Sequence, residues 1–308
     1  MPTTEQKTST RISLSNLLFA TDFSAAADAA LPYALAISRH YEGTLHAVHV
    51  IPEMDILVHP QTTTPITFES AFDNESRAAI ETMRDLIPEL QNMPHKVYVC
   101  RGKVWDVLSE IITEQRIDLL VLGTHGRTGI GKLVIGSIAE EVLRQASCPV
   151  LTVGPKASGR LKEQFDPTTK GIRPADIELK QIIYALDFSP ESLAAAPFAI
   201  SLAEEFQARL GLLHVIDQHL PPPTELVPQR LENLVPEEAA LWCAPEAIVK
   251  FGRPGEKILQ VASECKADLI VLGVRAAKAH SSTASHLPWS TAHAVITNAS
   301  CPVLTIRK

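Results

Sequence analysis

Short apolar runs alternate with longer amphipathic segments along the chain. The runs at 16–21 (NLLFAT), 45–50 (LHAVHV), 95–100 (HKVYVC), 118–123 (DLLVLG) and 149–153 (PVLTV) each have the length of a single strand. The first of them is almost continuously apolar, which is typical of a strand buried on both faces of a parallel sheet.

The segment after the first run predicts a helix. It spans residues 22–43, with Ser24 as the expected N-cap and Gly43 as the expected stop. Pro32 lies inside this helix and predicts a bend, because proline removes one backbone hydrogen bond.

Two later segments also predict helices. Apolar residues recur at helical spacing in 104–115, and 137–146 begins with SIAE, which has the form of a capping box. Five strands alternating with helices predict an α/β fold, an open five-stranded parallel sheet with helices on both faces. A ligand crevice is expected beyond the carboxyl ends of the strands, where the strand order reverses.

The whole succession occurs twice. Four matches in one order indicate two tandem copies of one unit rather than a local coincidence. Pro197 also stands at the place of Pro32, so the bend is expected in both copies. The matching segments are 17–24 and 182–189, 45–50 and 210–215, 117–123 and 267–273, and 146–153 and 299–306.

The repeats set the expected domain organisation. The segment between the copies mixes Gly, Pro and charged residues without apolar periodicity, which is typical of a linker. The polar start of the chain lacks the apolar core of a signal peptide. We expect a disordered tail at 1–11, a first domain at 12–155, a linker at 156–177 and a second domain at 178–308.

Composition narrows the functional class. With 45% hydrophobic and 20% charged residues, the chain has the profile of a globular protein. A net charge of −7 disfavours binding to nucleic acid, which needs a basic surface. No apolar run approaches the roughly 20 residues that cross a bilayer. We therefore expect neither nucleic acid nor membrane as a partner, and a cytoplasmic location.

The cysteines and histidines do not form a metal-binding pattern. The five cysteines are widely spaced and include no CxxC pair. Cys148 and Cys301 lie in the same sequence motif, ASCPVLT, and we expect them to be small buried residues. His46 and His49 are three apart on one expected strand, so they point to opposite faces and cannot share an ion. We expect a packing or hydrogen-bonding role for His49, because His214 occupies its place in the second copy.

The glycine-rich stretch after the fourth strand, GTHGRTGIGKLVIGS at 123–137, is the main candidate for chemistry. Its GRTGIGKL resembles a P-loop, but Leu133 stands where Ser or Thr would hold Mg²⁺. A chance cluster of loop glycines is a second interpretation. The third is an anion site, because Gly136 and Ser137 introduce a helix whose amides and dipole suit phosphate. His125, Arg127 and Lys132 add positive charge.

Four residues of this stretch carry a resemblance to a known family. Gly123, Gly126, Gly136 and Ser137 spell G-x2-G-x9-G-S, which resembles the ATP-binding signature of the universal stress protein family. ATDFS in the first strand, HV closing the second and ASCPVL before the last resemble that family too. The resemblance covers both repeats and implies a Rossmann-like, adenine nucleotide alpha hydrolase-like fold.

The resemblance also implies a ligand, ATP, with Mg²⁺ as a candidate companion, bound in the first repeat. Asp22 would contact the ribose or adenine side, and Val50 would meet adenine through its backbone. The ribose and phosphates would be held by Gly123, Gly126, Gly136 and Ser137, with His125, Arg127 and Ile138 alongside.

The second repeat departs from the signature. Ala276 stands at the place of Gly126 and Trp289 at the place of Gly136, and Pro288 is added before it. Asp187, Val215, Gly273 and Ser290 remain at the places of Asp22, Val50, Gly123 and Ser137. We expect the second domain not to bind ATP and to pair with the first as an internal partner, through edge strands such as PVLTV.

These expectations favour a nucleotide-binding regulatory protein of the stress response over a metabolic enzyme, with slow ATP hydrolysis at most. One alternative is a nucleotide-free scaffold. Another is an enzyme that activates a substrate with ATP, but such relatives carry a Ser- and Gly-rich loop after the first strand, where this chain reads ATDFSAAADAA. A homodimer and an unidentified protein partner stay open.

Overall fold

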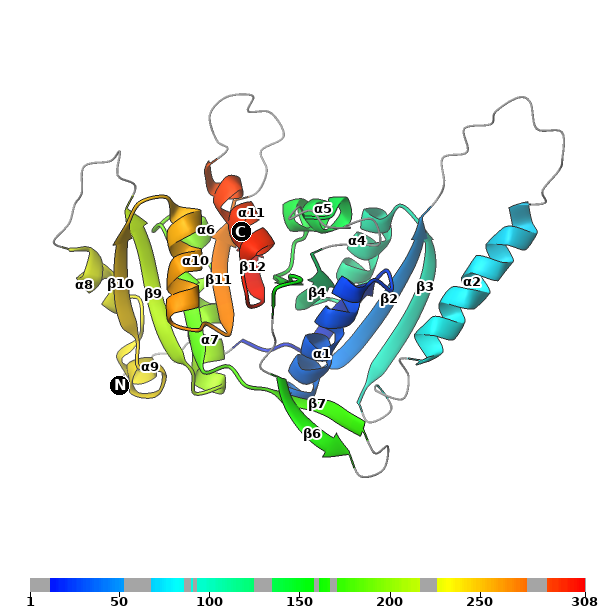
Figure 1. Ribbon diagram of the computed structural model, residues 1–308, viewed down its shortest axis with the longest axis horizontal. Coiled ribbons are helices and arrows are strands. Elements are labelled where there is room, and N and C mark those ends of the chain that lie inside the picture. The colour runs from blue at the N-terminus through cyan, green and yellow to red at the C-terminus, as the bar shows by residue number, and fades with distance from the viewer. Residues whose placement is uncertain are drawn as a thin grey trace, which may run out of the picture. The chain divides into compact units, whose positions relative to one another are not determined.

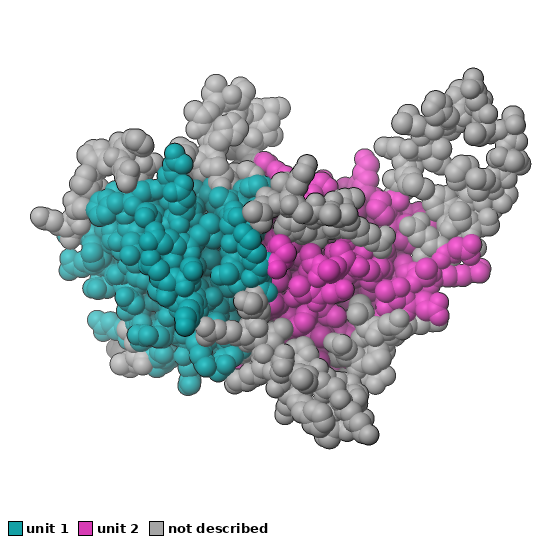
Figure 2. Space-filling view, in the orientation of Figure 1, with its two compact units in different colours: residues 1–13, 156–162, 177–308 teal, residues 14–155, 163–176 magenta. Residues whose placement is uncertain are grey.

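The computed structural model describes residues 12–52, 68–85, 90, 93–124, 135–157, 161–166, 171–216, 226–275 and 287–307. The chain divides into two compact units, which Figure 2 shows in different colours. Their main ranges are 14–155 and 177–308. The expected domain ranges of 12–155 and 178–308 lie close to these, while the expected tail at 1–11 lies outside the described residues.

The unit that contains the first repeat is built on five parallel strands in the order β3-β2-β1-β4-β5. The order reverses between β1 and β4, which are neighbours in the sheet. Its elements, most of which are labelled in Figure 1, are β1 (Asn16–Thr21), α1 (Ala25–His40), β2 (Thr44–Pro52), α2 (Phe68–Asp85), β3 (His95–Gly102), α4 (Val104–Glu114), β4 (Leu119–Gly123), α5 (Ser137–Gln145) and β5 (Val150–Val153).

The unit that contains the second repeat has the corresponding strand order, β10-β9-β8-β11-β12, again with parallel pairs. Its elements are β8 (Gln181–Ala185), α6 (Pro190–Leu193), α7 (Ala196–Glu205), β9 (Arg209–Ile216), α8 (Val227–Glu232), α9 (Glu237–Cys243), β10 (Glu246–Phe251), α10 (Pro254–Glu264), β11 (Leu269–Val274), α11 (Leu287–Asn298) and β12 (Val303–Arg307).

The core of each unit lies on both faces of its sheet. Leu17 and Leu18 of the central strand β1 are fully buried, and so are Ile182 and Ile183 of β8. Crossovers between parallel strands are right-handed, which puts α1 and α2 on one face of the first sheet and α4 and α5 on the other. In agreement, α1 contacts β1, β4 and β5, and α4 contacts α5. The predicted α/β fold in two tandem copies is confirmed.

The segment expected as a linker contains two strands, β6 (Leu161–Asp166) and β7 (Gly171–Ile177), which pair with each other. Their sequences, LKEQFD and GIRPADI, lack the apolar periodicity that revealed the other strands. The pairing of β6 with β7 could therefore not be predicted from the apolar pattern of the sequence.

The first helix of each repeat contains a proline, and the two helices differ in whether they continue through it. In the first repeat α1 runs through Pro32 without interruption, and Ser24 caps it as predicted by accepting from the Ala27 amide at 3.3 Å. In the second repeat the helix is divided into α6 and α7 just before Pro197.

The expected stop at Gly43 is wrong. The C-cap of α1 is Tyr41, and Glu42 takes the left-handed conformation, with φ 52°, that often terminates helices. Gly43 is required for a different reason, because a β-carbon there would lie 2.6 Å from the Leu14 carbonyl oxygen.

The recurring cysteines are buried, as predicted. Cys148 and Cys301 are 7% and 4% exposed, and the described cysteines are all free thiols. Burial raises the pKa of both thiols to about 12, so neither is ionised near neutral pH. These residues act as small apolar side chains that fill the space before β5 and β12.

Candidate functional site

The strand order of the first repeat reverses between β1 and β4, and a ligand crevice is expected at the carboxyl ends of these strands. We call this region the first crevice, and the matching region of the second repeat the second crevice. Ala20 of β1 is aligned with Leu122 of β4, so the residues that follow each strand emerge side by side. Thr21 is likewise aligned with His49 of β2. The structure therefore brings three of the predicted site residues, Asp22, Val50 and Gly123, to one edge of the sheet.

Asp22 lies in a tight turn between β1 and α1. Its Oδ1 accepts a hydrogen bond from the Ser24 amide at 3.0 Å, and the Thr21 Oγ1 accepts one from the Phe23 amide at 3.0 Å. Phe23 has φ 58°, a left-handed conformation that is rare for a bulky residue. We call Thr21–Ser24 the aspartate turn.

His49 of β2 supports this turn. Its ring stacks on the Phe23 ring with the centroids 4.3 Å apart and the planes 29° apart. Its Nδ1 lies 2.8 Å from the Thr21 carbonyl oxygen and donates a hydrogen bond to it. His49 is 6% exposed, which confirms the predicted packing and hydrogen-bonding role. The sequence analysis did not single out Phe23. Its pairing with His49 could have been suspected, because DFS and HV recur together in both repeats.

Gly123 ends β4 against the first turn of α1. A β-carbon at this position would lie 2.5 Å from both the backbone carbon and the carbonyl oxygen of Ala26. In the second repeat, a β-carbon on Gly273 would collide with the Glu191 carbonyl oxygen. Packing of the helix on the sheet therefore requires glycine in both repeats, whatever each repeat binds.

The helix after β4 begins differently from the prediction. Gly136 is the N-cap of α5, no side chain caps the helix, and Ser137 is its first residue. The Gly136 amide donates to the Thr124 carbonyl oxygen at 2.8 Å, which ties the helix start to the end of β4. Glu140 pairs with Arg144 at 2.8 Å. The predicted capping box is therefore wrong, because Ser137 lies one position too late to act as the cap.

The amino-terminal amides of α5 consequently have no acceptor supplied by a capping side chain. Ile138, in the first turn, is 39% exposed, about as much as Ile80 of α2 at 40%. The predicted site residues His125, Gly126 and Arg127 lie outside the described residues.

The second repeat contains a matching turn after β8. The Asp187 Oδ1 accepts from the Ser189 amide at 2.9 Å, and Phe188 has φ 60°. His214 Nδ1 lies 2.9 Å from the Leu186 carbonyl oxygen, and its ring centroid is 5.0 Å from that of Phe188. The aspartate turn and its histidine are thus common to both repeats.

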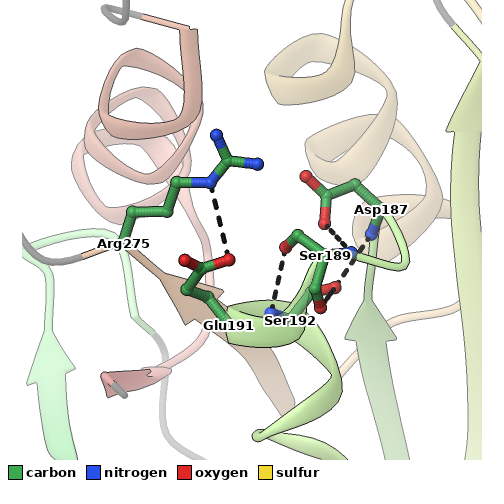
Figure 3. A network of polar contacts seen from close by, with 5 residues as sticks. All are labelled: Asp187, Ser189, Glu191, Ser192 and Arg275. Atoms are coloured by element: carbon green, nitrogen blue, oxygen red, sulfur yellow. Dashed lines mark hydrogen bonds and ion pairs between the residues drawn. The ribbon is translucent and has the colours of Figure 1, made fainter.

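The side chain of Ser192 adds polar contacts to this second turn, because the first repeat has Ala27 in its place (Figure 3). The Ser192 amide donates to the Ser189 Oγ at 3.2 Å, as the Ala27 amide does to the Ser24 Oγ at 3.3 Å. In addition, the Ser192 Oγ lies 3.4 Å from the Asp187 amide. Burial alone would raise the pKa of Asp187, but hydrogen bonds from Ser189 and Ser192 and the charge of Arg275 outweigh it, so the pKa lies below the ordinary value of an aspartate.

Charged side chains line the second crevice. The Arg275 Nε lies 3.6 Å from the Glu191 Oε2, and these residues occupy the places of His125 and Ala26. The guanidinium of Arg230, on α8, lies 4.1 Å from the centre of the Phe188 ring.

The helix after β11 also starts earlier than its counterpart. α11 begins at Leu287, so Trp289, which matches the N-cap Gly136, is already helical. Pro288 occupies the second position, where proline is well tolerated because its missing amide would be unpaired anyway. Ala276 lies outside the described residues, so its contribution to the second crevice stays a prediction.

The predicted separation of His46 from His49 agrees with the structure. His46 contacts the Tyr98 hydroxyl at 3.2 Å and the Asn16 Oδ1 at 3.3 Å, away from the aspartate turn. Burial, together with the charge of Lys96, lowers the pKa of His46 to about 4. Among the described residues, no group of His, Cys, Asp and Glu side chains is placed to hold a metal ion. Within the same part of the chain, every helix is too short or too polar to span a bilayer.

Comparison with known proteins gives the family of this fold and crevice. The model of the universal stress protein family matches residues 14–154 and 178–307, so the chain belongs to this family and contains two copies of its domain.

Single-domain relatives match one copy. A universal stress protein of Thermus aquaticus is 36% identical over 138 residues, which cover 42% of this chain and 98% of the relative. Universal stress protein A homolog 1 of Coxiella burnetii is 29% identical over 140 residues, which cover 45% of this chain and 94% of the relative.

A solved structure matches both copies. The universal stress protein from Archaeoglobus fulgidus shares the fold with a TM-score of 0.70 and 18% identity, over 96% of this chain and 99% of its own.

Proposed function

We propose that this protein binds ATP in its first repeat and acts as a nucleotide-responsive regulatory protein of the stress response, in the cytoplasm, rather than as a metabolic enzyme. Mg²⁺ is the proposed companion ion. The residues that would hold the nucleotide are Asp22, Val50, Gly123, His125, Gly126, Arg127, Gly136, Ser137 and Ile138.

The observation that supports this proposal most is the start of α5. A glycine N-cap leaves the first amides of the helix without a capping side chain, and the bond from Gly136 to Thr124 ties them to the end of β4. Such amides, together with the positive end of the helix dipole, favour a phosphate group. The cradle is also free of a β-carbon at Gly136, so phosphate oxygens have access to the backbone.

The aspartate turn supplies the other end of the proposed site. The Asp22 carboxylate lies at the end of β1, next to the strand whose end leads to α5. A carboxylate in this position can accept hydrogen bonds from the ribose hydroxyl groups. Val50 is on the neighbouring strand β2 and is 8% exposed, so its contribution to adenine binding would come from its backbone.

The second repeat is proposed as a partner that does not bind ATP in this manner. The early start of α11 and the Arg275–Glu191 ion pair both change the region that α5 and Ala26 occupy in the first repeat. Pairing between the two repeats, and a further homodimer or protein partner, are part of the same proposal.

A nucleotide-free scaffold is the alternative that one observation favours. Gly123 is required by helix packing, as is Gly273, so one glycine of the signature does not depend on a ligand. Mass spectrometry of the denatured protein separates the two functions, because a scaffold would carry no ATP through purification. Release of pyrophosphate would instead indicate an enzyme that activates a substrate.

The decisive experiment is calorimetry of ATP binding to the full chain and to Gly136→Asp, with and without Mg²⁺. Gly136 has φ −63° and ψ 150°, which any residue can adopt, so the variant should fold. Aspartate is a better N-cap than glycine, so stability should be unchanged or slightly higher. ATP affinity should fall at least about a hundredfold, because the carboxylate would occupy the phosphate position.

Gly136→Asn is the matched control. It caps the helix without adding charge, so it should reduce affinity by about tenfold only, and the difference between the variants measures the electrostatic part. Wild-type protein that fails to bind ATP, or Gly136→Asp protein that binds as tightly as wild type, would overturn the proposal.

A further inference from the structure

One imidazole contacts both sides of Asp22 in the first crevice. The Nδ1 of His49 bonds the carbonyl oxygen of Thr21, the residue before the aspartate, at 2.8 Å. The ring of His49 stacks on Phe23, the residue after it, at 4.3 Å between centroids. The backbone that carries the Asp22 carboxylate is therefore held from both ends by a side chain of the neighbouring strand.

The held backbone is unusual. Phe23 has φ 58°, and a phenylalanine left to itself rarely adopts the left-handed region. The stacked imidazole gives the Phe23 ring a partner that is available in this conformation. The conformation in turn lets the Asp22 Oδ1 accept the Ser24 amide at 3.0 Å, which sets the direction of the carboxylate.

The aspartate turn also occurs without the glycine N-cap that forms the phosphate end of the proposed site. The second repeat keeps Phe188 with φ 60° and the bond from His214 to Leu186 at 2.9 Å, although its helix after β11 starts differently. The Phe–His pair therefore does not depend on the glycine N-cap.

We infer that His49 is a positioning residue for the nucleotide: by holding Thr21 and Phe23 it directs the Asp22 carboxylate toward the ribose hydroxyl groups. This inference rests on the proposed function. It adds that recognition of the ribose depends on a buried side chain that does not itself touch the ligand.

The test combines a change in the protein with a change in the ligand. Affinities for ATP and for 2′,3′-dideoxy-ATP are measured by calorimetry on the full chain. Wild-type protein should prefer ATP by at least about tenfold, since even one hydrogen bond to a charged carboxylate is worth a factor of that order. In His49→Leu, which removes both the ring stacking and the hydrogen bond, that preference should fall to about twofold or less.

His214→Leu is the matched control, because it removes the same contacts from the second repeat. It should lower the melting temperature about as much as His49→Leu, and it should leave the preference for ATP over the dideoxy analogue at the wild-type value. A purely structural role of His49 would lower stability without moving this ratio.

His49→Phe keeps an aromatic ring for Phe23 and removes only the hydrogen bond, so it should fold even where His49→Leu does not. Its preference should fall between those of wild type and His49→Leu. An unchanged preference in either folded His49 variant would overturn the inference. Wild-type protein that binds no ATP would overturn the proposed function as well, so the two failures are distinguishable.

Discussion

The two repeats agree at the loop after their first strand and differ at the helix after their fourth. Both have an aspartate turn with a left-handed phenylalanine, at φ 58° for Phe23 and 60° for Phe188, and both have a histidine bonded to the strand end. Only the first has a glycine N-cap on the following helix, while α11 already includes Trp289.

The comparison separates glycines that the fold needs from those that it does not need. Gly123 and Gly273 are both glycine because a β-carbon would collide with the helix that crosses the strand end. Gly136 has a backbone conformation open to any residue, and the second repeat has a tryptophan in its place. A glycine that the backbone does not require is the better indication of a ligand.

The largest expected effect is the loss of folding stability on substitution of Gly123 or Gly273. Substitution of either by alanine should destabilise its own repeat by roughly 3 kcal/mol, because the new methyl group meets backbone atoms that cannot move aside. Urea unfolding followed by circular dichroism measures the loss, with one transition assigned to each repeat.

Gly136→Ala is the control for this pair, because its backbone angles of −63° and 150° suit alanine. Its effect should stay within about 1 kcal/mol, which is the range for changes at a helix cap. If Gly273→Ala unfolded at the wild-type urea concentration, the packing explanation for both glycines would be wrong.

The sequence predicted most of the fold because buried parallel strands leave a strong signal. β1, for example, was expected at 16–21 and spans Asn16–Thr21. The repeat strengthened the prediction, because a strand predicted in one copy is also predicted at the matching place in the other. The helix α2 was not among the expected elements, although its apolar residues Phe72, Ala79 and Met83 recur at helical spacing. The pairing of β6 with β7 leaves no such pattern.

The site was harder to predict because it depends on single hydrogen bonds. The start of α5 follows from the Gly136–Thr124 bond, which moves the cap one residue ahead of the Ser137 that the SIAE pattern suggested. The support of Asp22 by His49 depends on residues far apart in the chain that meet through the pairing of β1 with β2. Neither feature has a local sequence signature.

Lowering the pH should have an intermediate effect on folding stability, and this effect should be larger in the first repeat than in the second. His46, whose place in the second repeat is taken by Gly211, has a pKa lowered from 6.5 to about 4 because it is buried. The unfolded chain therefore takes up a proton between pH 6.5 and 4 that folded His46 does not accept. The first repeat should lose stability across this window as the pH falls.

Urea unfolding at pH 7 and at pH 4.5 measures this loss, and His46→Leu should remove much of it from the first repeat. The variant should also be less stable at pH 7, because the Tyr98 hydroxyl and the Asn16 amide group lose a partner. An equal dependence on pH in His46→Leu and wild type would show that another group causes the acid sensitivity.

The smallest expected effect concerns the Arg275–Glu191 ion pair, which is the most visible difference between the described parts of the two crevices. The two side chains are 51% and 27% exposed, and their charged atoms are 3.6 Å apart. A pair this accessible to solvent contributes less than about 1 kcal/mol. A double-mutant cycle of Arg275→Ala and Glu191→Ala should give a coupling energy below this value, and the coupling should weaken further at high salt.

The same double variant tests the proposal that the second repeat does not bind ATP. If the early start of α11 is the cause, removing both charges should leave the second crevice unable to bind, because the helix amides are still displaced. Calorimetry should then report one ATP per chain in the double variant, as in wild type. A second equivalent of ATP would show that the ion pair, and not the helix start, separates the two repeats.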